Sequence, residues 1–375
     1  MKKILFLTGT RADFGKIKSL ISILEEQQQF EVFVFVTGMH LQEEYGYTLI
    51  EIERCKFKNI HTFKNHTHET TMDLTLAKTI EGLSHYCKEV SPDMIVVHGD
   101  RVETLAGAIV GSLNNILVSH IEGGEVSGTV DELIRHSVSK LSHIHFVSNN
   151  EAKKRLIQMG EINESIFTIG SPDIDIMFSD QLPQLAIAKA YYKIEFEKYA
   201  IVMFHPVTTE IKEMQKYADT FVDALLQDNH NYVVIFPNND LGSQFIIQAY
   251  EKLKENSRFR VYPSLRFEYF LTLLKNSQFI IGNSSAGIRE APYYGIPIIN
   301  IGTRQQNRAV HADIINTDYS QEGIKEALSI IDSHTVKIVS DDFGKGNSDE
   351  LFLQCLKNDD IWQLNHQKQF RDLSN

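Results

Sequence analysis

Short apolar runs rich in Val, Ile, Leu and Phe recur along the chain and alternate with longer segments of helical spacing. In the first half these runs are KILFLTG, FEVFVFVTG, DMIVVHGD, NILVSHIEGG and HIHFVSN. In the second half they are YAIVMFHP, NYVVIFPNND, FRVYPS, QFIIGNSS and IPIINIG. Continuous apolar strands separated by helices indicate parallel sheets covered on both faces. The pattern therefore predicts an α/β fold with two doubly wound parallel sheets.

The two sets of strands predict two domains. The stretch 178–200 has no clear buried strand and contains Pro183, which is typical of a linker, so we place the boundary near residue 180. The length of 375 residues agrees, because one core rarely serves so long a chain. We expect an N-terminal domain over 1–180 and a C-terminal domain over 181–350. The helical stretch 351–375 is expected to pack back on the N-terminal domain.

Charge and cysteine content narrow the class of protein. The chain has 37 basic and 49 acidic residues, and a net charge of −12 argues against nucleic acid or an anionic membrane surface as the main partner. Cys55, Cys87 and Cys355 lie far apart, which predicts neither a disulfide framework nor a thiolate zinc site. No run approaches the ~18 apolar residues of a membrane span. These features fit a cytoplasmic protein.

Polar residues gather where the predicted strands end. In open parallel sheets, ligands bind beyond the carboxyl ends of the strands. Both halves of the chain carry charged and hydroxyl side chains there, so we expect one ligand cleft between the two domains. These strand ends are Thr8–Arg11, Gly38–His40, His98–Arg101, Glu122–Glu125, His205–Thr209, Pro237–Asp240 and Gly282–Glu290.

The first strand end, GTRADFGK, has the outline of a phosphate-binding turn. Five residues separate Gly9 from Gly15, and Ile17 stands where a Walker A loop has Ser or Thr, so an ATPase or kinase loop is not indicated. The dinucleotide pattern G-x-G-x-x-G is also missing. What remains is a turn that carries Arg11 ahead of a helix, which fits an anion site and an ordinary strand-to-helix connection equally well.

Several carboxylates follow two other strands of the first half. Asp100 and Arg101 end VVHGDRVET, and the loop-rich SHIEGGEVSGTVDELIRHS supplies Glu122, Glu125, Asp131 and Glu132. Clustered carboxylates suit proton transfer at carbon or stabilisation of an oxocarbenium-like sugar. The alternative is a solvated acidic loop in which Asp131 caps a helix. The flanking glycines favour a site, because they allow close approach of a ligand to the backbone.

The second half offers groups suited to a diphosphate. Ser284 and Ser285 in GNSSAGIREAP precede a helix, and Glu290 lies one to two turns further on, where it could accept from ribose hydroxyls. An ordinary serine helix cap is the alternative. His205 in MFHPVTT could bind phosphate or have a structural role. Arg304 and Arg308 in GTRQQNR could bind phosphate or be surface cations. His61, His66 and His68 lack a second ligand set, so no metal site is expected.

Taken together, nine motifs resemble the hydrolysing UDP-N-acetylglucosamine 2-epimerases, bacterial enzymes that open the sialic-acid pathway. The motifs are GTRADFGK, TGMH, HGDR, HIEGGEVSGTVDELIRHSVSKLSHIH, GSPDID, FHPVT, PNND, GNSSAGIREAP and GTRQ, in order from residue 1 to at least residue 310. The resemblance implies the GT-B fold, with two Rossmann-like domains, a nucleotide in their cleft, and conversion of UDP-N-acetylglucosamine and water to N-acetylmannosamine and UDP. Non-hydrolysing relatives typically read GTRPE, QGD and HVEAGLRTG, and this chain departs from all three.

The resemblance also implies roles for single residues. It places the sugar chemistry on Asp100, Glu122 and Asp131, and it leaves open which of them is base and which is acid. It places UDP on Arg11, His205, Ser284, Ser285, Glu290 and Arg304, with His40 and Arg101 near the sugar or the phosphate. A UDP-sugar substrate, no cofactor, no metal and a homodimer or homotetramer are expected.

Four alternatives to this function stay open on the sequence. The first is the same reaction on a UDP-linked 2,4-diacetamido-trideoxy sugar of the legionaminic-acid pathway. The others are a non-hydrolysing 2-epimerase, a GT-B glycosyltransferase and a non-catalytic sugar-nucleotide sensor.

Overall fold

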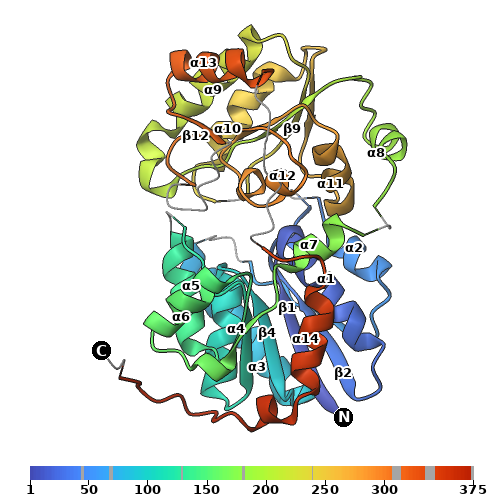
Figure 1. Cartoon of the computed structure of the whole chain (residues 1–375), viewed down its shortest axis with the longest axis vertical. Helices are drawn as coiled ribbons and strands as arrows, with labels where there is room; N and C mark the ends of the chain where they lie inside the picture. The colour runs from blue at the N-terminus through green and yellow to red at the C-terminus, as the bar shows by residue number, and fades with distance from the viewer. Residues whose placement is uncertain are drawn as a thin grey trace. The chain divides into compact units, whose positions relative to one another are not determined.

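The computed structural model describes residues 1–43, 46–66, 71–127, 130–179, 182–238, 240–305, 314–333 and 343–372 (Figure 1). His68 and Arg308, both named above, lie outside these ranges. The chain divides into two compact units. Unit 1 comprises Met1–Glu125, Asp131–Ser179 and Asp342–Asn375, and unit 2 comprises Val126–Val130 and Asp180–Asp341.

Unit 1 is built on a seven-stranded sheet with the order β3-β2-β1-β4-β5-β6-β7, and its neighbouring strands run parallel. Its strands are β1 (Lys2–Thr8), β2 (Phe30–Val36), β3 (Ile60–Thr62), β4 (Met94–His98), β5 (Leu117–Ile121), β6 (Ile144–Val147) and β7 (Ile166–Thr168). The strand order reverses between β1 and β4. In doubly wound sheets this reversal opens a crevice at the carboxyl ends of the strands, where ligands bind.

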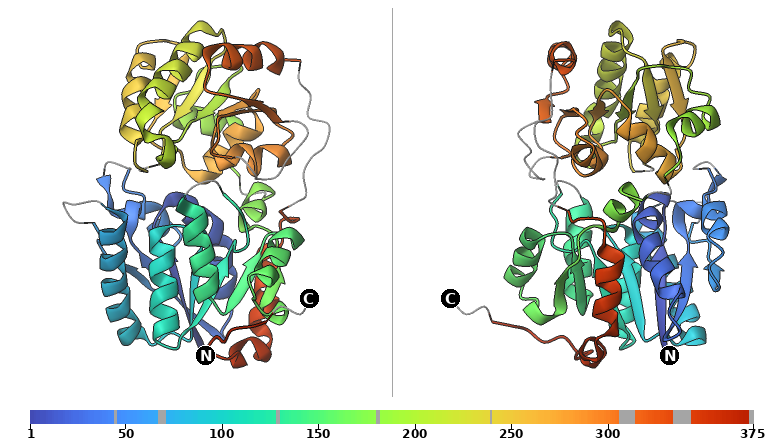
Figure 2. Two further views of the ribbon diagram at one scale, coloured as in Figure 1. Left: turned by 90° about the vertical axis from the view of Figure 1, so that its left-hand side faces the viewer. Right: turned by 45° about the vertical axis from the view of Figure 1, so that its right-hand side comes forward.

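Helices follow the strands of unit 1 and lie on both faces of its sheet (Figure 2). They are α1 (Arg11–Glu25), α2 (Leu49–Arg54), α3 (Met72–Val90), α4 (Val102–Leu113), α5 (Val130–Leu141), α6 (Asn150–Gln158), α7 (Pro172–Met177) and α14 (Ser348–Lys357). The described part of the unit also contains the short 3₁₀ turns η1 (Gly38–Leu41), η3 (Asn163–Ser165) and η7 (Asp359–Gln363).

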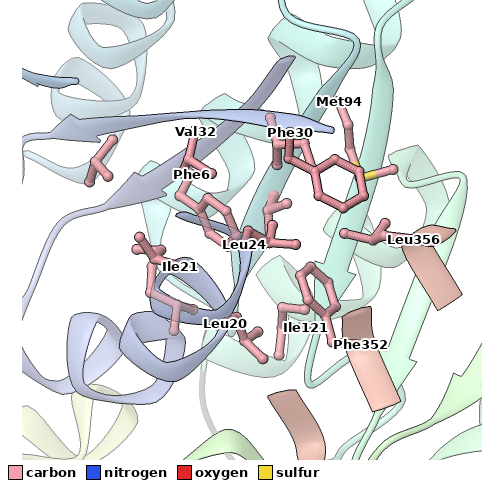
Figure 3. Close-up of a cluster of buried hydrophobic side chains, with 14 of the residues drawn as sticks. Phe6, Leu20, Ile21, Leu24, Phe30, Val32, Met94, Ile121, Phe352 and Leu356 are labelled. Atoms are coloured by element: carbon pink, nitrogen blue, oxygen red, sulfur yellow. The ribbon is translucent and has the colours of Figure 1, made fainter. Parts of the chain in front are cut away.

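The central strand β1 shows why its apolar run is continuous. Ile4 and Phe6 point into one core, shared with α1 and α14, whereas Leu5 and Leu7 point into a second core shared with α3 and α4. Alternate residues of a strand face opposite sides of a sheet, so a strand buried on both sides needs apolar residues throughout. Figure 3 shows the first of these cores, with Phe6 among the labelled side chains.

The C-terminal part of the chain, Asp342–Asn375, belongs to unit 1. Ahead of α14, Ser171 N donates to Phe343 O. At the first residue of α14, Ser348 N donates to Asp175 Oδ1 at 2.9 Å. Asp175 Oδ2 also accepts from Asp349 N at 3.2 Å, so this carboxylate of α7 caps the start of α14. Burial raises the pKa of Asp175 to about 6.

Unit 2 contains a second parallel sheet with the order β10-β9-β8-β11-β12-β13. Its strands are β8 (Ala200–Met203), β9 (Tyr232–Ile235), β10 (Phe259–Tyr262), β11 (Ile280–Gly282), β12 (Ile298–Ile301) and β13 (Ile314–Thr317). Its helices are α8 (Leu185–Tyr191), α9 (Met214–Gln227), α10 (Ser243–Tyr250), α11 (Phe267–Lys275), α12 (Glu290–Tyr293) and α13 (Gln321–Ile331), with the 3₁₀ turns η4 (Thr208–Glu213), η5 (Glu251–Leu253) and η6 (Ser285–Gly287).

Both units are thus Rossmann-like parallel α/β folds, as the alternation of apolar runs predicts. Three strands of the structure, β3, β7 and β13, were not predicted. Each is an edge strand of its sheet. Among the described residues, no helix has the length and apolar character needed to cross a membrane.

Candidate functional site

The turn between β1 and α1 is organised by Asp13. Its carboxylate accepts from Thr8 Oγ1 at 2.6 Å and from the backbone N–H groups of Gly9 and Thr10, both at 3.0 Å. Thr10 Oγ1 accepts from Asp13 N in return, which completes a capping box at the start of α1. This role of Asp13 was not predicted, although the pattern Thr-x-x-Asp before an apolar helix is the signal for such a cap. Arg11 is consequently held at the first position of α1.

Arg11 is ion-paired within unit 1. Its Nη2 donates to Glu51 Oε1 of α2 at 2.8 Å, and both side chains are partly exposed. A cation at the carboxyl end of β1 can bind an anion there by exchanging this carboxylate for it.

His40 is fully buried rather than presented to solvent. Thr8 Oγ1 lies 3.0 Å from its Nε2, and Thr48 Oγ1 lies 2.7 Å from its Nδ1. Thr8 already donates to Asp13, so the neutral ring donates from Nε2 and accepts at Nδ1. Burial lowers the pKa of His40 to about 4, so the imidazole is neutral at physiological pH. Through these contacts His40 stabilises the turn between β1 and α1.

Glu122 lies directly after β5 and has a positive φ of 65°. Residues other than glycine seldom adopt this backbone conformation. Its carboxylate is buried. Oε1 accepts from Ser171 Oγ at 2.9 Å and lies 3.3 Å from Lys16 Nζ. Lys16 Nζ also lies 3.4 Å from Asp173 Oδ2 of α7. On the other side, Glu122 Oε2 lies 3.4 Å from His98 Nε2.

Arg135 of α5 joins two of the predicted catalytic carboxylates. Its Nη2 pairs with Asp100 Oδ2, and its Nη1 donates to the backbone oxygen of Glu122 at 2.7 Å. Arg135 is buried and Asp100 is partly exposed. Asp131, also partly buried, lies four residues before Arg135 and so on the same side of α5. The sequence analysis did not single out Arg135, which only the packing of α5 brings to this edge of the sheet.

Arg101 is the residue before α4 and lies beside a tightly packed backbone. Its Nε lies 3.7 Å from Glu103 Oε2. Glu103 is buried next to Gly9 and Gly38, and Gly38 has a φ of 61°. A Cβ on Gly38 would lie 2.5 Å from Gly9 O and 2.8 Å from Glu103 Oε1, so only glycine fits at this strand end.

In unit 2, His205 follows β8 and is held at three atoms. Asn283 Oδ1 accepts from His205 N at 2.6 Å, and Asn283 Nδ2 donates to His205 O at 2.9 Å. His205 Nδ1 accepts from Asn238 N at 3.1 Å, so the neutral ring carries its hydrogen on Nε2. Burial, and secondarily the charge of Arg304, keeps the pKa of His205 well below its usual value. His205 is therefore a neutral donor at the carboxyl end of β8.

The serine-rich loop begins at Gly282, whose φ is 140°. A Cβ there would lie 2.0 Å from Met203 O, so this turn requires glycine. Ser284 Oγ accepts from Ala286 N at 3.3 Å and caps η6, as the alternative interpretation proposed. Ser285 is partly exposed, and Glu290 is buried at the start of the four-residue helix α12. The helix expected after the serines is thus short.

Arg304 lies in the turn after β12, next to the serine-rich loop. Arg304 Nη1 and Gln305 Nε2 both donate to Asn283 O, at 3.3 and 2.8 Å. Thr303 Oγ1 donates to Glu210 Oε1 of η4 at 2.6 Å, which ties this turn to the loop after β8. Asn283, which the sequence analysis left without a role, brings His205, Ser284 and Arg304 together.

Two histidines of the first half, His61 and His145, have structural surroundings. His61 stacks on Tyr86 with 4.1 Å between ring centroids, and His145 Nε2 lies 3.0 Å from Glu161 Oε2. Within the described part of the chain, no group of three or more His, Cys, Asp or Glu side chains is arranged to hold a metal ion.

Comparison with known proteins identifies the family. The model of the UDP-N-acetylglucosamine 2-epimerase family matches residues 22–357. The chain is 48% identical to the UDP-N-acetylglucosamine 2-epimerase of Neisseria meningitidis serogroup B, with all of both chains covered. It is 32% identical to the UDP-N,N'-diacetylbacillosamine 2-epimerase (hydrolyzing) of Legionella pneumophila, over 95% of this chain and 96% of the relative.

A solved structure agrees with the fold. The Methanocaldococcus jannaschii UDP-GlcNAc 2-epimerase, in complex with UDP-GlcNAc and UDP, matches with a TM-score of 0.79 at 22% identity, over 95% of this chain and 99% of that one. The fold is therefore GT-B-like, as the sequence predicts. With a family model that matches most of its length and a relative at nearly half identity, the chain belongs to the UDP-N-acetylglucosamine 2-epimerase family.

Proposed function

We propose that this protein is a hydrolysing UDP-N-acetylglucosamine 2-epimerase, which converts UDP-N-acetylglucosamine and water to N-acetylmannosamine and UDP for sialic-acid biosynthesis. The observation that carries the proposal is the group of carboxylates at the carboxyl end of the unit 1 sheet. Glu122 is buried beside Lys16 and His98, and Asp100 is paired with Arg135. Charged groups held in place by their neighbours suit a reaction in which protons move and charge develops.

The chemistry requires such groups because the proton on carbon 2 is a poor acid. In our mechanism the bond from carbon 1 to the diphosphate breaks early, and nearby carboxylates stabilise the positive charge at carbon 1. One carboxylate takes the proton from carbon 2, which leaves UDP and 2-acetamidoglucal. Water then adds at carbon 1 while an acid protonates carbon 2 from the opposite face. Two proton transfers on different faces need at least two groups, and we assign them to Asp100, Glu122 and Asp131.

We assign the nucleotide to groups at the strand ends. His205 is suited to donate a hydrogen bond from Nε2, because its Nδ1 already accepts from the backbone. Arg304 and Arg11 supply positive charge for the diphosphate. Hydroxyl and carboxylate oxygens for the nucleotide come from Ser284, Ser285 and Glu290. Arg101 supplies a further cation near the sugar or the phosphate. We assign His40 an indirect role, since it contacts the turn that carries Arg11 through Thr8.

One relative favours a second substrate. The Legionella pneumophila relative is named for a UDP-N,N'-diacetylbacillosamine substrate and for hydrolysis. The second candidate is accordingly the same reaction on a UDP-linked 2,4-diacetamido-trideoxy sugar.

Proton NMR of the products formed in heavy water tests the reaction with each UDP-sugar. We expect UDP and free N-acetylmannosamine from UDP-N-acetylglucosamine, with deuterium from the solvent at carbon 2, because elimination and hydration exchange that proton. Stable UDP-N-acetylmannosamine as the product would indicate a non-hydrolysing enzyme. Retention of the original proton at carbon 2 would exclude the elimination mechanism. Faster turnover of the diacetamido sugar would select the second candidate.

A separate prediction concerns the UDP site of unit 2. Glu290→Ala and Ser285→Ala should each weaken UDP binding by about 1 to 3 kcal/mol, because each removes hydrogen bonds to a polar or charged ligand. Isothermal titration calorimetry with UDP measures the effect. Glu326→Ala and Ser329→Ala, which alter exposed residues of α13, are matched controls and should bind as the wild type does. Wild-type affinity in both site variants would remove this assignment.

A further inference from the structure

His98 and Glu122 are brought together by the register of two central strands. His98 is the last residue of β4 and pairs with Ile121, the last residue of β5, so Glu122 follows immediately beside it. The imidazole Nε2 lies 3.4 Å from Glu122 Oε2, and both side chains are more than nine-tenths buried. Thr104 Oγ1 donates to His98 O at 2.7 Å and holds the end of β4 in place. The pair is therefore positioned by the sheet rather than by a loose loop.

The two oxygens of Glu122 face different chemistry. Oε1 accepts from Ser171 Oγ and lies beside Lys16 Nζ, a hydroxyl and a cation that both stabilise negative charge. Oε2 faces His98, whose imidazole is the side chain that most readily exchanges a proton near neutral pH. The carboxylate thus has one oxygen that is held and one oxygen beside a proton carrier.

Lys16 lies beside two buried carboxylates, because its Nζ is 3.3 Å from Glu122 Oε1 and 3.4 Å from Asp173 Oδ2. The ammonium therefore lies on the Oε1 side of Glu122, and His98 lies on the Oε2 side.

Two further titratable groups lie on neighbouring elements. Arg135 of α5 is paired with Asp100. His120 of β5 interacts electrostatically with His98, but burial lowers the pKa of His120 to about 3, so it stays neutral. His98 is the histidine that faces Glu122 Oε2.

We propose that His98 is the proton partner of Glu122 and acts on the substrate through it. The inference rests on the proposed function. When the carbon 2–hydrogen bond breaks, the proton joins Glu122 Oε2, and the electron pair forms the carbon 1–carbon 2 double bond as the carbon 1–oxygen bond breaks and its pair leaves with UDP. Oε2 then passes the proton to His98 Nε2. The carboxylate is restored, the imidazole becomes imidazolium, and release of that proton to solvent resets the pair.

The test compares His98→Gln with the wild type and with His85→Gln, which changes an exposed histidine of α3. Glutamine can hydrogen-bond to Glu122 but cannot accept a proton at neutral pH. We expect kcat to fall by about 100-fold in His98→Gln, with UDP affinity unchanged, because the acid-base partner is lost. The wild-type kcat should fall toward acidic pH, because a pair that already holds a proton cannot accept one from carbon 2. His98→Gln should shift this acidic limb, because Glu122 then accepts the proton without its partner, and His85→Gln should keep the limb of the wild type.

Two further variants separate the proton role from a structural one. Ser171→Ala removes the hydroxyl that donates to Glu122 Oε1 and leaves His98 in place, so it should lower kcat and leave the acidic limb in place. His98→Asn repeats the measurement if His98→Gln is not folded by circular dichroism. A wild-type protein that releases neither UDP nor a reducing sugar would refute the proposed function. With an active wild type, an acidic limb that stays at the same pH in His98→Gln, or an unchanged kcat in that variant, would overturn the role of His98.

Discussion

Asp100→Asn, Glu122→Gln and Asp131→Asn are each expected to lower turnover by about 100-fold or more while UDP binding changes little. The substitutions preserve the size of the side chains and most of their hydrogen bonds. They remove the negative charge that stabilises carbon 1 and the ability to exchange a proton at neutral pH. Turnover, UDP affinity and released 2-acetamidoglucal should be measured for all three. At least one variant should release the glycal, because elimination and hydration use their proton carriers in a different order.

The structure adds a distinction among these variants. Asp100 pairs with Arg135, which also donates to the backbone of Glu122, so Asp100→Asn should disturb the position of Glu122 as well. The exposed carboxylates Asp73 and Glu151 provide matched controls, and Asp73→Asn and Glu151→Gln should turn over as the wild type does. Near wild-type turnover in a site variant would remove that residue from the mechanism. A loss confined to UDP affinity would make it a binding residue.

Phe352→Ala should destabilise the protein by about 3 to 5 kcal/mol, the range typical of a large aromatic side chain removed from a core. Phe352 is fully buried on α14, and its ring centroid lies 4.7 Å from that of Phe146 and 6.4 Å from that of Phe6. The cavity would open between α14 and the unit 1 sheet, whose partner residues cannot close it without moving a central strand. Urea unfolding followed by circular dichroism measures the loss.

Phe370→Ala is the control for this experiment. Phe370 is 92% exposed and lies in the same C-terminal part of the chain, so its removal should change the free energy of unfolding by less than about 0.5 kcal/mol. Equal stability of Phe352→Ala and the wild type would show that α14 does not contribute to the core of unit 1.

The sequence alone determined the class of the fold and the central strands. Strands such as β1 and β8 are buried on both faces, so burial requires the continuous apolar runs that identify them. The edge strands β3, β7 and β13 are short, and most of their residues are partly or fully exposed, so burial leaves little mark on them. These strands form because a neighbouring strand offers backbone hydrogen bonds, and that neighbour is distant in sequence.

The strand-end rule also found most of the candidate site, because the carboxyl ends of parallel strands meet at one edge whatever the details of packing. Asp100, Glu122 and His205 were all located in this way. What the sequence could not determine was how each of these residues is held. His40 is a polar residue at a strand end, yet packing buries it completely and lowers its pKa.

Only the tertiary structure decided which partners the site residues have. Lys16 and Glu122 are 106 positions apart, and helix α1 packed on the sheet brings the Lys16 ammonium to the Glu122 carboxylate. Strand register brings His98 to the same carboxylate, and the packing of α5 brings Arg135 to Asp100. Charge and proton affinity depend on neighbours within a few ångströms, and spacing along the chain does not encode those distances. The sequence therefore names the candidate groups, and the fold decides which partners surround them.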